Sequence, residues 1–178
     1  MRHLKKVSEE VLHTNPWWKY KHDTYQKPNG QIGDYFYGET PGMVIVIPLL
    51  RDGRLVLTLQ YRYLEDKQSV EFPGGGMKED EESIVAAARE LRGETGFEAE
   101  EFVHLGTFAS TNGMLKDTSH VFLARVANQG VSIPDDTEEI AVLYRWPREF
   151  EEMIRRKEIW DGQTLAAWVL GQESVAHT

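Results

Sequence analysis

Two glutamates four residues apart, Glu90 and Glu94, have the spacing that points most directly to chemistry. On a helix, residues four apart lie one above the other on the same face, and two like charges placed there destabilise a bare helix by roughly 0.2–0.5 kcal/mol. A hard cation between the carboxylates would reverse this effect, because Mg²⁺ takes oxygen ligands and binds through a few carboxylates together with substrate phosphates. Taken alone, the pair is also typical of a solvated helix face, so the surrounding residues have to decide.

The two glutamates lie near the end of the stretch Gly75–Phe97, which begins with a glycine-rich turn and continues as an alanine-rich amphipathic run. The glycines of Pro73–Gly76 end extended structure and let the backbone approach a ligand closely. We expect the following helix to start with Asp80 as its N-cap and to end at Gly96. Apolar residues recur at helical spacing and predict a core-facing stripe, with the glutamates on its flank: Ile84, Ala87, Ala88 and Leu91.

The composition limits the classes of protein that this chain can belong to. With 178 residues, 40% of them hydrophobic and 28% charged, it is typical of one globular domain. Zero cysteines exclude a disulfide framework, a thiolate zinc site and a cysteine nucleophile. The net charge of −9 argues against a nucleic acid as the main partner, and an acidic protein that handles phosphates needs cations. Without an apolar leader or a long apolar run, we expect a soluble cytoplasmic protein with no membrane partner.

Residues 1–40 are rich in aromatic side chains. The turn signal Lys27–Gly30 lies between segments 17–26 and 31–38, which predicts a β-hairpin. An isolated hairpin is marginal in water, so its aromatic face has to pack on something. It either covers its own domain or forms a subunit interface, with some aromatics reaching a ligand. The aromatic residues are Trp17, Trp18, Tyr20, Tyr25, Tyr35, Phe36 and Tyr37.

The rest of the chain alternates strand and helix signals. The continuous apolar run Met43–Leu49 predicts a strand that is buried on both faces. Pro147 and Asp161 are suited to start two later helices, the second of which we expect to end near Gly171. Together these signals predict an α/β fold with a mixed sheet covered on both faces. Further strands are expected at 55–61, 70–72, 102–108, 119–126 and 140–146.

The stretch Gly75–Phe97 fits the Nudix box, G-x5-E-x7-R-E-U-x-E-E-x-G-U with U an apolar residue, at every spacing. One position departs, because Gly93 stands where the box has the first acid of its Glu-Glu pair. On these residues the chain resembles the Nudix hydrolase superfamily. The matching positions are Gly75, Glu81, Arg89, Glu90, Leu91, Glu94, Gly96 and Phe97.

Four further segments resemble the branch that hydrolyses ADP-ribose and nucleoside diphosphate sugars: Gln60–Tyr63, Glu71–Gly75, Ser119–Ala124 and Ile159–Ala167. The resemblance implies a Nudix α/β/α sandwich over residues 41–178 and a homodimer that exchanges N-terminal strands through residues 1–40. It also implies cleavage of the pyrophosphate bond in a small-molecule substrate such as ADP-ribose or GDP-mannose, with Mg²⁺ or Mn²⁺ as cofactor. The products would be a nucleoside monophosphate and a sugar phosphate.

The resemblance assigns roles to the residues around the box. Glu90 and Glu94 match the main metal ligands, and Gly74 matches the residue whose carbonyl contacts the metal. Glu81 matches a further acid that binds or supports the metal, and Arg89 matches the arginine that orients the box carboxylates. Arg62 matches an arginine that contacts the substrate diphosphate. Four further side chains are expected to contact the substrate: Tyr35, Trp18, Glu71 and Asn112.

An acidic loop after the box holds the expected general base. Glu138 matches a glutamate that reaches the metals, and Asp136 stands where the branch often has a glutamate base, with Glu139 as a further candidate. A run of acids is also typical of a plain surface loop. Asn112 stands where ADP-ribose hydrolases usually have a proline, which favours a broader or different sugar nucleotide. The alternatives are a Nudix hydrolase of another nucleotide, a nucleoside triphosphate or a dinucleoside polyphosphate, and a non-catalytic nucleotide-binding protein, which only Gly93 supports.

Overall fold

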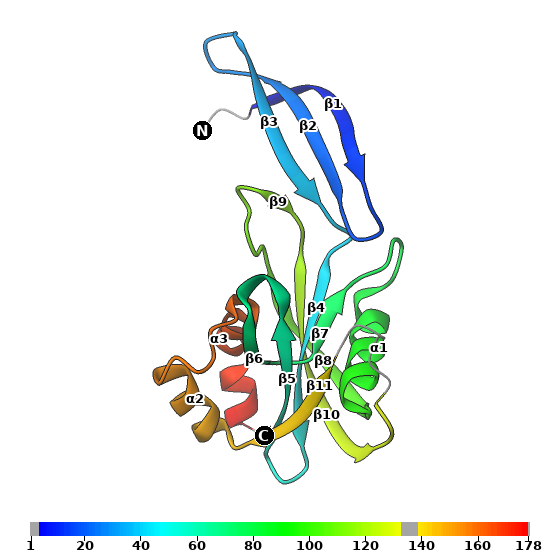
Figure 1. The fold of residues 1–178 in the computed structure, drawn as a ribbon, viewed down its shortest axis with the longest axis vertical. Helices are drawn as coiled ribbons and strands as arrows, with labels where there is room; N and C mark the ends of the chain where they lie inside the picture. The colour runs from blue at the N-terminus through cyan, green and yellow to red at the C-terminus, as the bar shows by residue number, and fades with distance from the viewer. Residues whose placement is uncertain (1–3, 133–138, 178) are drawn as a thin grey trace.

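The computed structural model describes residues 4–132 and 139–177 of the chain. Within these ranges a small N-terminal sheet extends away from a larger central sheet that is flanked by helices (Figure 1). The small sheet has the order β1 (Lys5–Thr14), β2 (Lys19–Gln26), β3 (Ile32–Glu39) and β9 (Leu115–Lys116). The acids Asp136 and Glu138, predicted to contribute to catalysis, lie outside the described residues.

The central sheet is mixed, as the sequence predicts. Its order is β11 (Ile140–Arg145), β5 (Leu55–Arg62), β4 (Met43–Leu50), β10 (Ser119–Gln129) and β8 (Phe97–Phe108). Two short strands extend it, β6 (Lys67–Glu71) beside β5 and β7 (Gly74–Gly76) beside β4. β4 runs parallel to β10 and antiparallel to β5 and β7.

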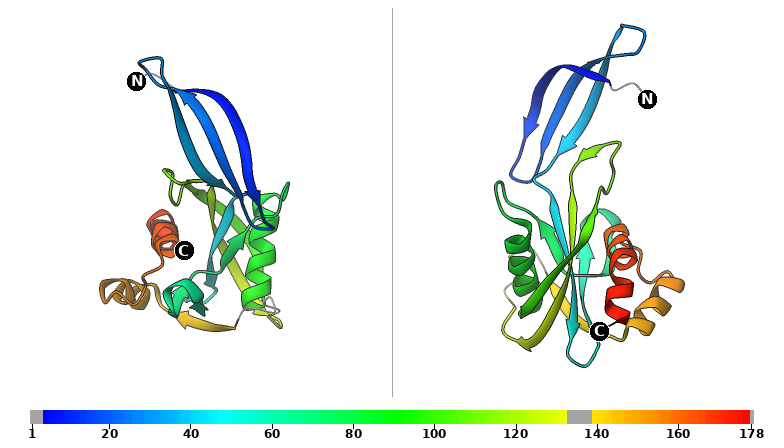
Figure 2. Two further views of the ribbon diagram at one scale, coloured as in Figure 1. Left: turned by 45° about the horizontal axis from the view of Figure 1, so that its top comes forward. Right: turned by 180° about the vertical axis from the view of Figure 1, so that it is seen from behind.

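Helices cover both faces of this sheet. α1 (Ser83–Thr95) packs on one face, and α2 (Pro147–Arg155) and α3 (Gly162–Ala176) lie on the other (Figure 2). The apolar run of β4 supplies both cores, because successive side chains of a strand point to opposite faces. Val44 and Val46 pack in the cluster with α1, whereas Ile45 and Ile47 pack in the cluster with α2 and α3. The predicted α/β/α arrangement is thus confirmed.

Two details of α1 differ from the sequence prediction. The helix starts at Ser83 after an extended Glu82, and Asp80 lies in the preceding turn with φ 61° instead of capping the helix. The predicted core stripe is also partly wrong, because Ile84 and Ala88 are exposed. The side chains that α1 buries are Ala86, Ala87, Leu91, Glu94 and Thr95. Its predicted end is confirmed, since Gly96 adopts a left-handed φ of 74°.

α3 begins as predicted and ends later than predicted. The Asp161 carboxylate accepts a hydrogen bond from the Thr164 backbone N–H at 2.7 Å, which confirms the N-cap. The helix continues past Gly171 to Ala176. Gly171 is buried against Ile47, so this glycine provides a close approach between helix and sheet and does not stop the helix. No helix in the described residues is long and apolar enough to cross a membrane.

The N-terminal hairpin is confirmed as β2 and β3, which pair antiparallel from Lys19↔Glu39 to Gln26↔Ile32. β1, a mostly polar strand, was not predicted, and all of its residues are exposed. One face of this sheet carries a row of neighbouring rings, in which His22 stacks on Phe36 with ring centroids 4.4 Å apart. The other rings of the row are Tyr20, Trp18 and His13. The aromatic row formed by these five residues stays largely uncovered within one chain.

Candidate active site

The glutamates of α1 meet β7, the glycine strand that follows β6. We expected these glycines to end extended structure, and this prediction is wrong: Gly74–Gly76 pair antiparallel with β4, so closely that a Cβ at Gly74 would lie 2.3 Å from the Val44 carbonyl oxygen. Glu94 is buried, with 4% of its surface exposed, and its Oε2 accepts a hydrogen bond from the Gly74 N–H at 3.3 Å. This burial is deeper than the flank position that the helical pattern predicts. The Glu90 carboxylate lies against Gly75, where a Cβ atom would come within 2.6 Å of Glu90 Oε1. The chain therefore needs glycine at 75 because the carboxylate occupies the space of a side chain.

Arg89 connects the acids of the box. Its Nε and Nη2 donate to the two carboxylate oxygens of Glu81 at 2.9 and 2.8 Å, and its Nη1 donates to Glu90 Oε1 at 2.6 Å. Nη2 also donates to the Gly76 carbonyl at 3.0 Å. Arg89 lowers the pKa of Glu81 to about 2, and the Lys78 N–H adds to this effect. Glu81, Glu90 and β7 are thus held by one guanidinium.

Arg62 stands at the end of β5 and pairs with a buried acid. Its Nε donates to Glu71 Oε1 at 2.8 Å, and its Nη2 donates to Glu71 Oε2. The pKa of Arg62 is raised, first by this hydrogen-bonded pair and further by the charges of Asp161 and Glu94. Glu71 is only 4% exposed. We expected Glu71 to touch the substrate, whereas the structure places it beneath Arg62 as the partner that holds the guanidinium.

The carboxylate and carbonyl oxygens gathered here are of the kind that a hard divalent cation prefers. Two carboxylates of one helix lie beside the backbone of β7, Glu94 at the Gly74 N–H and Glu90 against Gly75. No group of three or more acidic, histidine or cysteine side chains gathers in a metal-binding arrangement in the described ranges. Mg²⁺ suits such a sparse site, because it keeps several waters and takes the substrate phosphates as further ligands.

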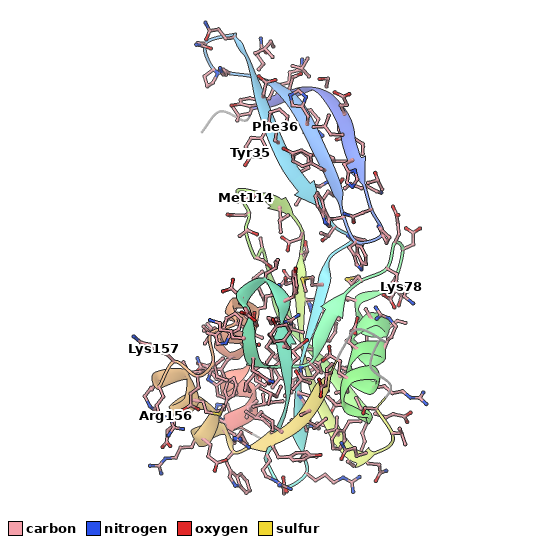
Figure 3. The ribbon with its side chains drawn as sticks, viewed as in Figure 1. Tyr35, Phe36, Lys78, Met114, Arg156 and Lys157 are labelled. Carbon is pink, nitrogen blue, oxygen red and sulfur yellow. The ribbon has the colours of Figure 1, made fainter. Side chains whose placement is uncertain are left out.

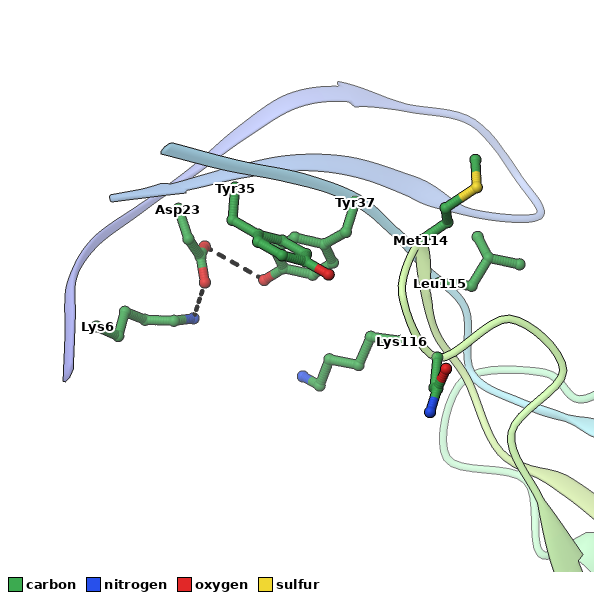
Figure 4. Close-up of a pocket in the computed structure, with 8 residues that line it drawn as sticks. Lys6, Asp23, Tyr35, Tyr37, Met114, Leu115 and Lys116 are labelled. Carbon is green, nitrogen blue, oxygen red and sulfur yellow. Dashed lines mark hydrogen bonds and ion pairs between the residues drawn. The ribbon is translucent and has the colours of Figure 1, made fainter. Parts of the chain in front are cut away.

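The remaining expected substrate contacts fall into two separate hollows beside the N-terminal sheet. Tyr35 and Asn112 line a hollow of about 360 Å³ between this sheet and the loop that joins β8 to β10, with Lys6 and Lys116 at its sides (Figure 4). Tyr35 from β3 lies near Met114 of that loop (Figure 3), and its hydroxyl donates to the Gly113 carbonyl at 2.8 Å. Trp18 lines the second hollow, beside the loop that carries Glu81.

The acidic loop ends next to the arginine site. Glu139, its last acid, is exposed and directly precedes β11. The first residue of β11, Ile140, pairs with Gln60, which is two residues before Arg62 on β5. The strand pairing therefore brings the end of this loop toward the end of β5 that carries Arg62.

One group of residues near the site was not predicted to act there. Gln60 Nε2 donates to Glu71 Oε2 at 3.4 Å, and the Thr164 hydroxyl accepts the Phe72 N–H at 3.2 Å. Trp160 Nε1 donates to the Gln68 carbonyl at 3.2 Å. The sequence offered one signal for these contacts, since the segments around residues 60, 71 and 160–164 all resemble the same branch.

The comparisons with known proteins agree with this geometry. The sequence profile of the NUDIX domain matches residues 40–168, which is most of the chain. The chain belongs to the Nudix family. This Nudix hydrolase is 29% identical over 177 residues to the methanol dehydrogenase activator of Bacillus methanolicus, and the match covers 97% of this chain and 96% of that protein.

A second relative is the ADP-ribose pyrophosphatase of Bacillus subtilis (strain 168), 27% identical over 143 residues, with 79% of this chain and 77% of that protein covered. The crystal structure of an ADP compounds hydrolase has the same fold, with a TM-score of 0.85 and 17% sequence identity. That match covers 99% of this chain and 96% of the other. The predicted family and fold are therefore confirmed.

Proposed function

We propose that this Nudix hydrolase cleaves the pyrophosphate bond of nucleoside diphosphate sugars, such as ADP-ribose or GDP-mannose, in the cytoplasm. The observation that carries the proposal is the short segment that joins the two parts of the site: Glu71 holds the Arg62 guanidinium, and three residues later the Gly74 N–H donates to Glu94 of α1. A site with both acidic oxygens and a guanidinium suits a diphosphate, because the acids can hold cations while the arginine binds phosphate oxygens directly. The similarity to an ADP-ribose pyrophosphatase supports the same substrate class.

Glu90 and Glu94, with the Gly74 carbonyl and the support of Glu81, would hold Mg²⁺ or Mn²⁺. The cation would neutralise phosphate charge and lower the pKa of a bound water. Arg62 would hold the diphosphate in line for attack. Its Nε and Nη2 donate to Glu71, so the Nη1 edge of the guanidinium is the one that would donate to the phosphate oxygens. Asp136, Glu138 or Glu139 would accept the proton of the attacking water.

The reaction is a hydrolysis of an acid anhydride. The water oxygen forms a bond to one phosphorus as the bond from that phosphorus to the bridging oxygen breaks. The proton of the water goes to the base, and the bridging oxygen leaves on the second phosphate. The products are a nucleoside monophosphate and a sugar phosphate. Tyr35 with Asn112, and Trp18 in its separate hollow, are the proposed contacts for the base and the sugar.

A second copy of the chain is the proposed partner of the N-terminal sheet. The aromatic row on the N-terminal sheet supports this proposal, because tryptophan, tyrosine and phenylalanine are favoured at protein interfaces and several rings here are exposed. Burying them against a second sheet would remove apolar surface from water.

The experiment that tests the proposed function is a product assay. ADP-ribose, GDP-mannose, UDP-glucose, a nucleoside triphosphate and a dinucleoside polyphosphate are compared at saturating Mg²⁺, with ¹⁸O water to identify the attacked phosphorus. Glu94→Gln is expected to lose metal-dependent turnover, and Glu98→Gln, at an exposed position just past the box, is expected to retain it. Preferred hydrolysis of the triphosphate would refute the substrate class. Metal-dependent turnover that survives Glu94→Gln would refute the metal site.

A second candidate function involves a protein partner. The similarity to the methanol dehydrogenase activator runs over 97% of this chain and so includes the N-terminal sheet. In this case the same hydrolase would stimulate a dehydrogenase. Methanol dehydrogenase assayed with and without the protein tests it, and the candidate fails if the dehydrogenase rate does not change.

A further inference from the structure

The first turn of α3 makes the contact on which this inference rests. Thr164 is 1% exposed, and its Oγ1 accepts a hydrogen bond from the Phe72 N–H at 3.2 Å. Asp161 fixes the same turn by accepting the Thr164 N–H at 2.7 Å. Thr164 is therefore held by the helix cap and in turn holds a backbone amide 92 residues away in the sequence.

The amide of Phe72 needs this acceptor. β6 ends at Glu71, so the next N–H has to find a partner outside the sheet, and a buried donor without a partner is unfavourable. The ring of Phe72 is 3% exposed and packs between α2 and α3, with its centroid 4.9 Å from that of Phe150 and 6.3 Å from that of Trp168. The place of Phe72 is thus set by the two C-terminal helices.

Phe72 lies between the two halves of the site. Glu71, the residue before Phe72, accepts hydrogen bonds from Arg62. Gly74, two residues after Phe72, donates its N–H to Glu94. Trp160 holds the other end of the same strand, because its Nε1 donates to the Gln68 carbonyl at 3.2 Å. A shift of β6 would therefore move the Arg62 guanidinium and β7 together.

We propose that Thr164 and Trp160 are positioning residues of the Nudix site, which hold β6 and the turn after it so that Arg62 and Gly74 face Glu94. This inference rests on the proposed function, in which Arg62 binds the substrate diphosphate. It gives the segment 160–164 a task in the reaction although the segment itself lies outside the Nudix box.

Thr164→Val tests the proposal, because it removes the hydroxyl acceptor at nearly constant volume, and Thr164→Ser is the matched control that keeps the hydroxyl and loses the methyl group. We expect the KM for ADP-ribose to rise about tenfold in Thr164→Val, as is common when a residue supporting a site is lost. Thr164→Ser should stay close to wild type. In an Arg62→Ala background, Thr164→Val should raise KM by a smaller factor than in wild type, because part of its effect acts through Arg62.

Amide hydrogen exchange of the segment 67–76 provides a measurement that is independent of turnover. Thr164→Val should speed exchange there, with Thr164→Ser unchanged. Unchanged exchange and KM in a folded Thr164→Val, or equal losses in the two variants, would overturn the proposal. If wild type hydrolyses no sugar nucleotide, the proposed function fails, and the exchange data still decide whether Thr164 holds β6.

Trp160→Phe covers the case in which Thr164→Val does not fold. It removes the Nε1 donor and keeps an aromatic ring at a partly exposed position. Faster exchange at Gln68 with a smaller rise in KM supports the proposal. Wild-type exchange and KM in this variant overturn it.

Discussion

Gly75→Ala should separate the activity of this enzyme from its stability. The new Cβ would lie 2.6 Å from Glu90 Oε1, 2.8 Å from Glu90 Cδ and 3.1 Å from Glu90 Oε2. Ordinary van der Waals contact begins near 3.4 Å, so the carboxylate has to move by about 0.8 Å. The atoms that move are the end of a flexible side chain, so the fold can accommodate them at little cost.

The same movement is expected to be costly for the reaction. A misplacement of about 1 Å in a catalytic arrangement can reduce the rate about 10²-fold. That factor corresponds to about 2.7 kcal/mol of transition-state free energy, at roughly 1.36 kcal/mol for each tenfold. We therefore expect kcat/KM on ADP-ribose to fall about 10²-fold in Gly75→Ala, while the melting temperature of the metal-free protein changes little.

Two neighbouring glycines provide controls for this experiment. A Cβ at Gly76 would meet nothing within 4 Å, so Gly76→Ala should keep wild-type kinetics. A Cβ at Gly74 would run into the backbone carbonyl of Val44, so Gly74→Ala should lower stability as well as activity. Steady-state kinetics and thermal unfolding of all three variants test the reasoning. It is refuted if Gly75→Ala and Gly76→Ala have the same kcat/KM.

EDTA is expected to abolish turnover because the carboxylate pair needs a cation to receive a diphosphate, and added Mg²⁺ should restore it. Turnover that persists in EDTA would contradict the metal role. The pKa of Glu81 falls from 4.5 to about 2 in the folded protein, so its pairing with Arg89 stabilises the fold above pH 4.5 and loses this effect as the pH falls toward 2. The melting temperatures of wild type and Glu81→Gln should therefore converge over that interval, and a constant difference would contradict the assignment. Phe36→Asp, in the aromatic row, should convert a dimer into a monomer in light-scattering measurements, whereas Val131→Asp, at another exposed apolar position, should not. Equal masses for the two variants would argue against this interface.

The reaction class and the buried central strand could be predicted from the sequence alone. The residues from Gly75 to Phe97 match the Nudix box at every spacing, and this resemblance pointed to the family that the NUDIX domain match over residues 40–168 shows. The continuous apolar run of β4 likewise predicted a strand buried on both faces, and the alternation of Val44, Ile45, Val46 and Ile47 between two cores confirms it. Local rules sufficed for these features because they depend on neighbours in the sequence.

The two helix boundaries that were predicted wrongly depend on contacts that local rules do not include. Asp80 satisfies the local rule for an N-cap, yet Arg89 holds Glu81 in the segment before the helix, and α1 starts at Ser83. Gly171 satisfies the rule for a helix end, yet its missing side chain admits Ile47 of the sheet, and α3 continues. In both cases a contact between segments far apart in the chain, or a side chain reaching back along it, outweighs a local preference of about 1 kcal/mol.

Tertiary packing also set the roles of individual site residues. Glu71 has the residue type of a substrate contact, but its burial beneath Arg62 makes it the partner of that arginine. The sequence singled out the segment around Thr164 only by its resemblance to the branch, and only the packing of α3 on the end of β6 shows that the Thr164 hydroxyl meets the amide of Phe72. The motif determines which reaction class the chain can perform, because it specifies the charged groups. The fold determines which side chains meet the substrate, because burial and hydrogen bonding depend on segments that the sequence order keeps apart.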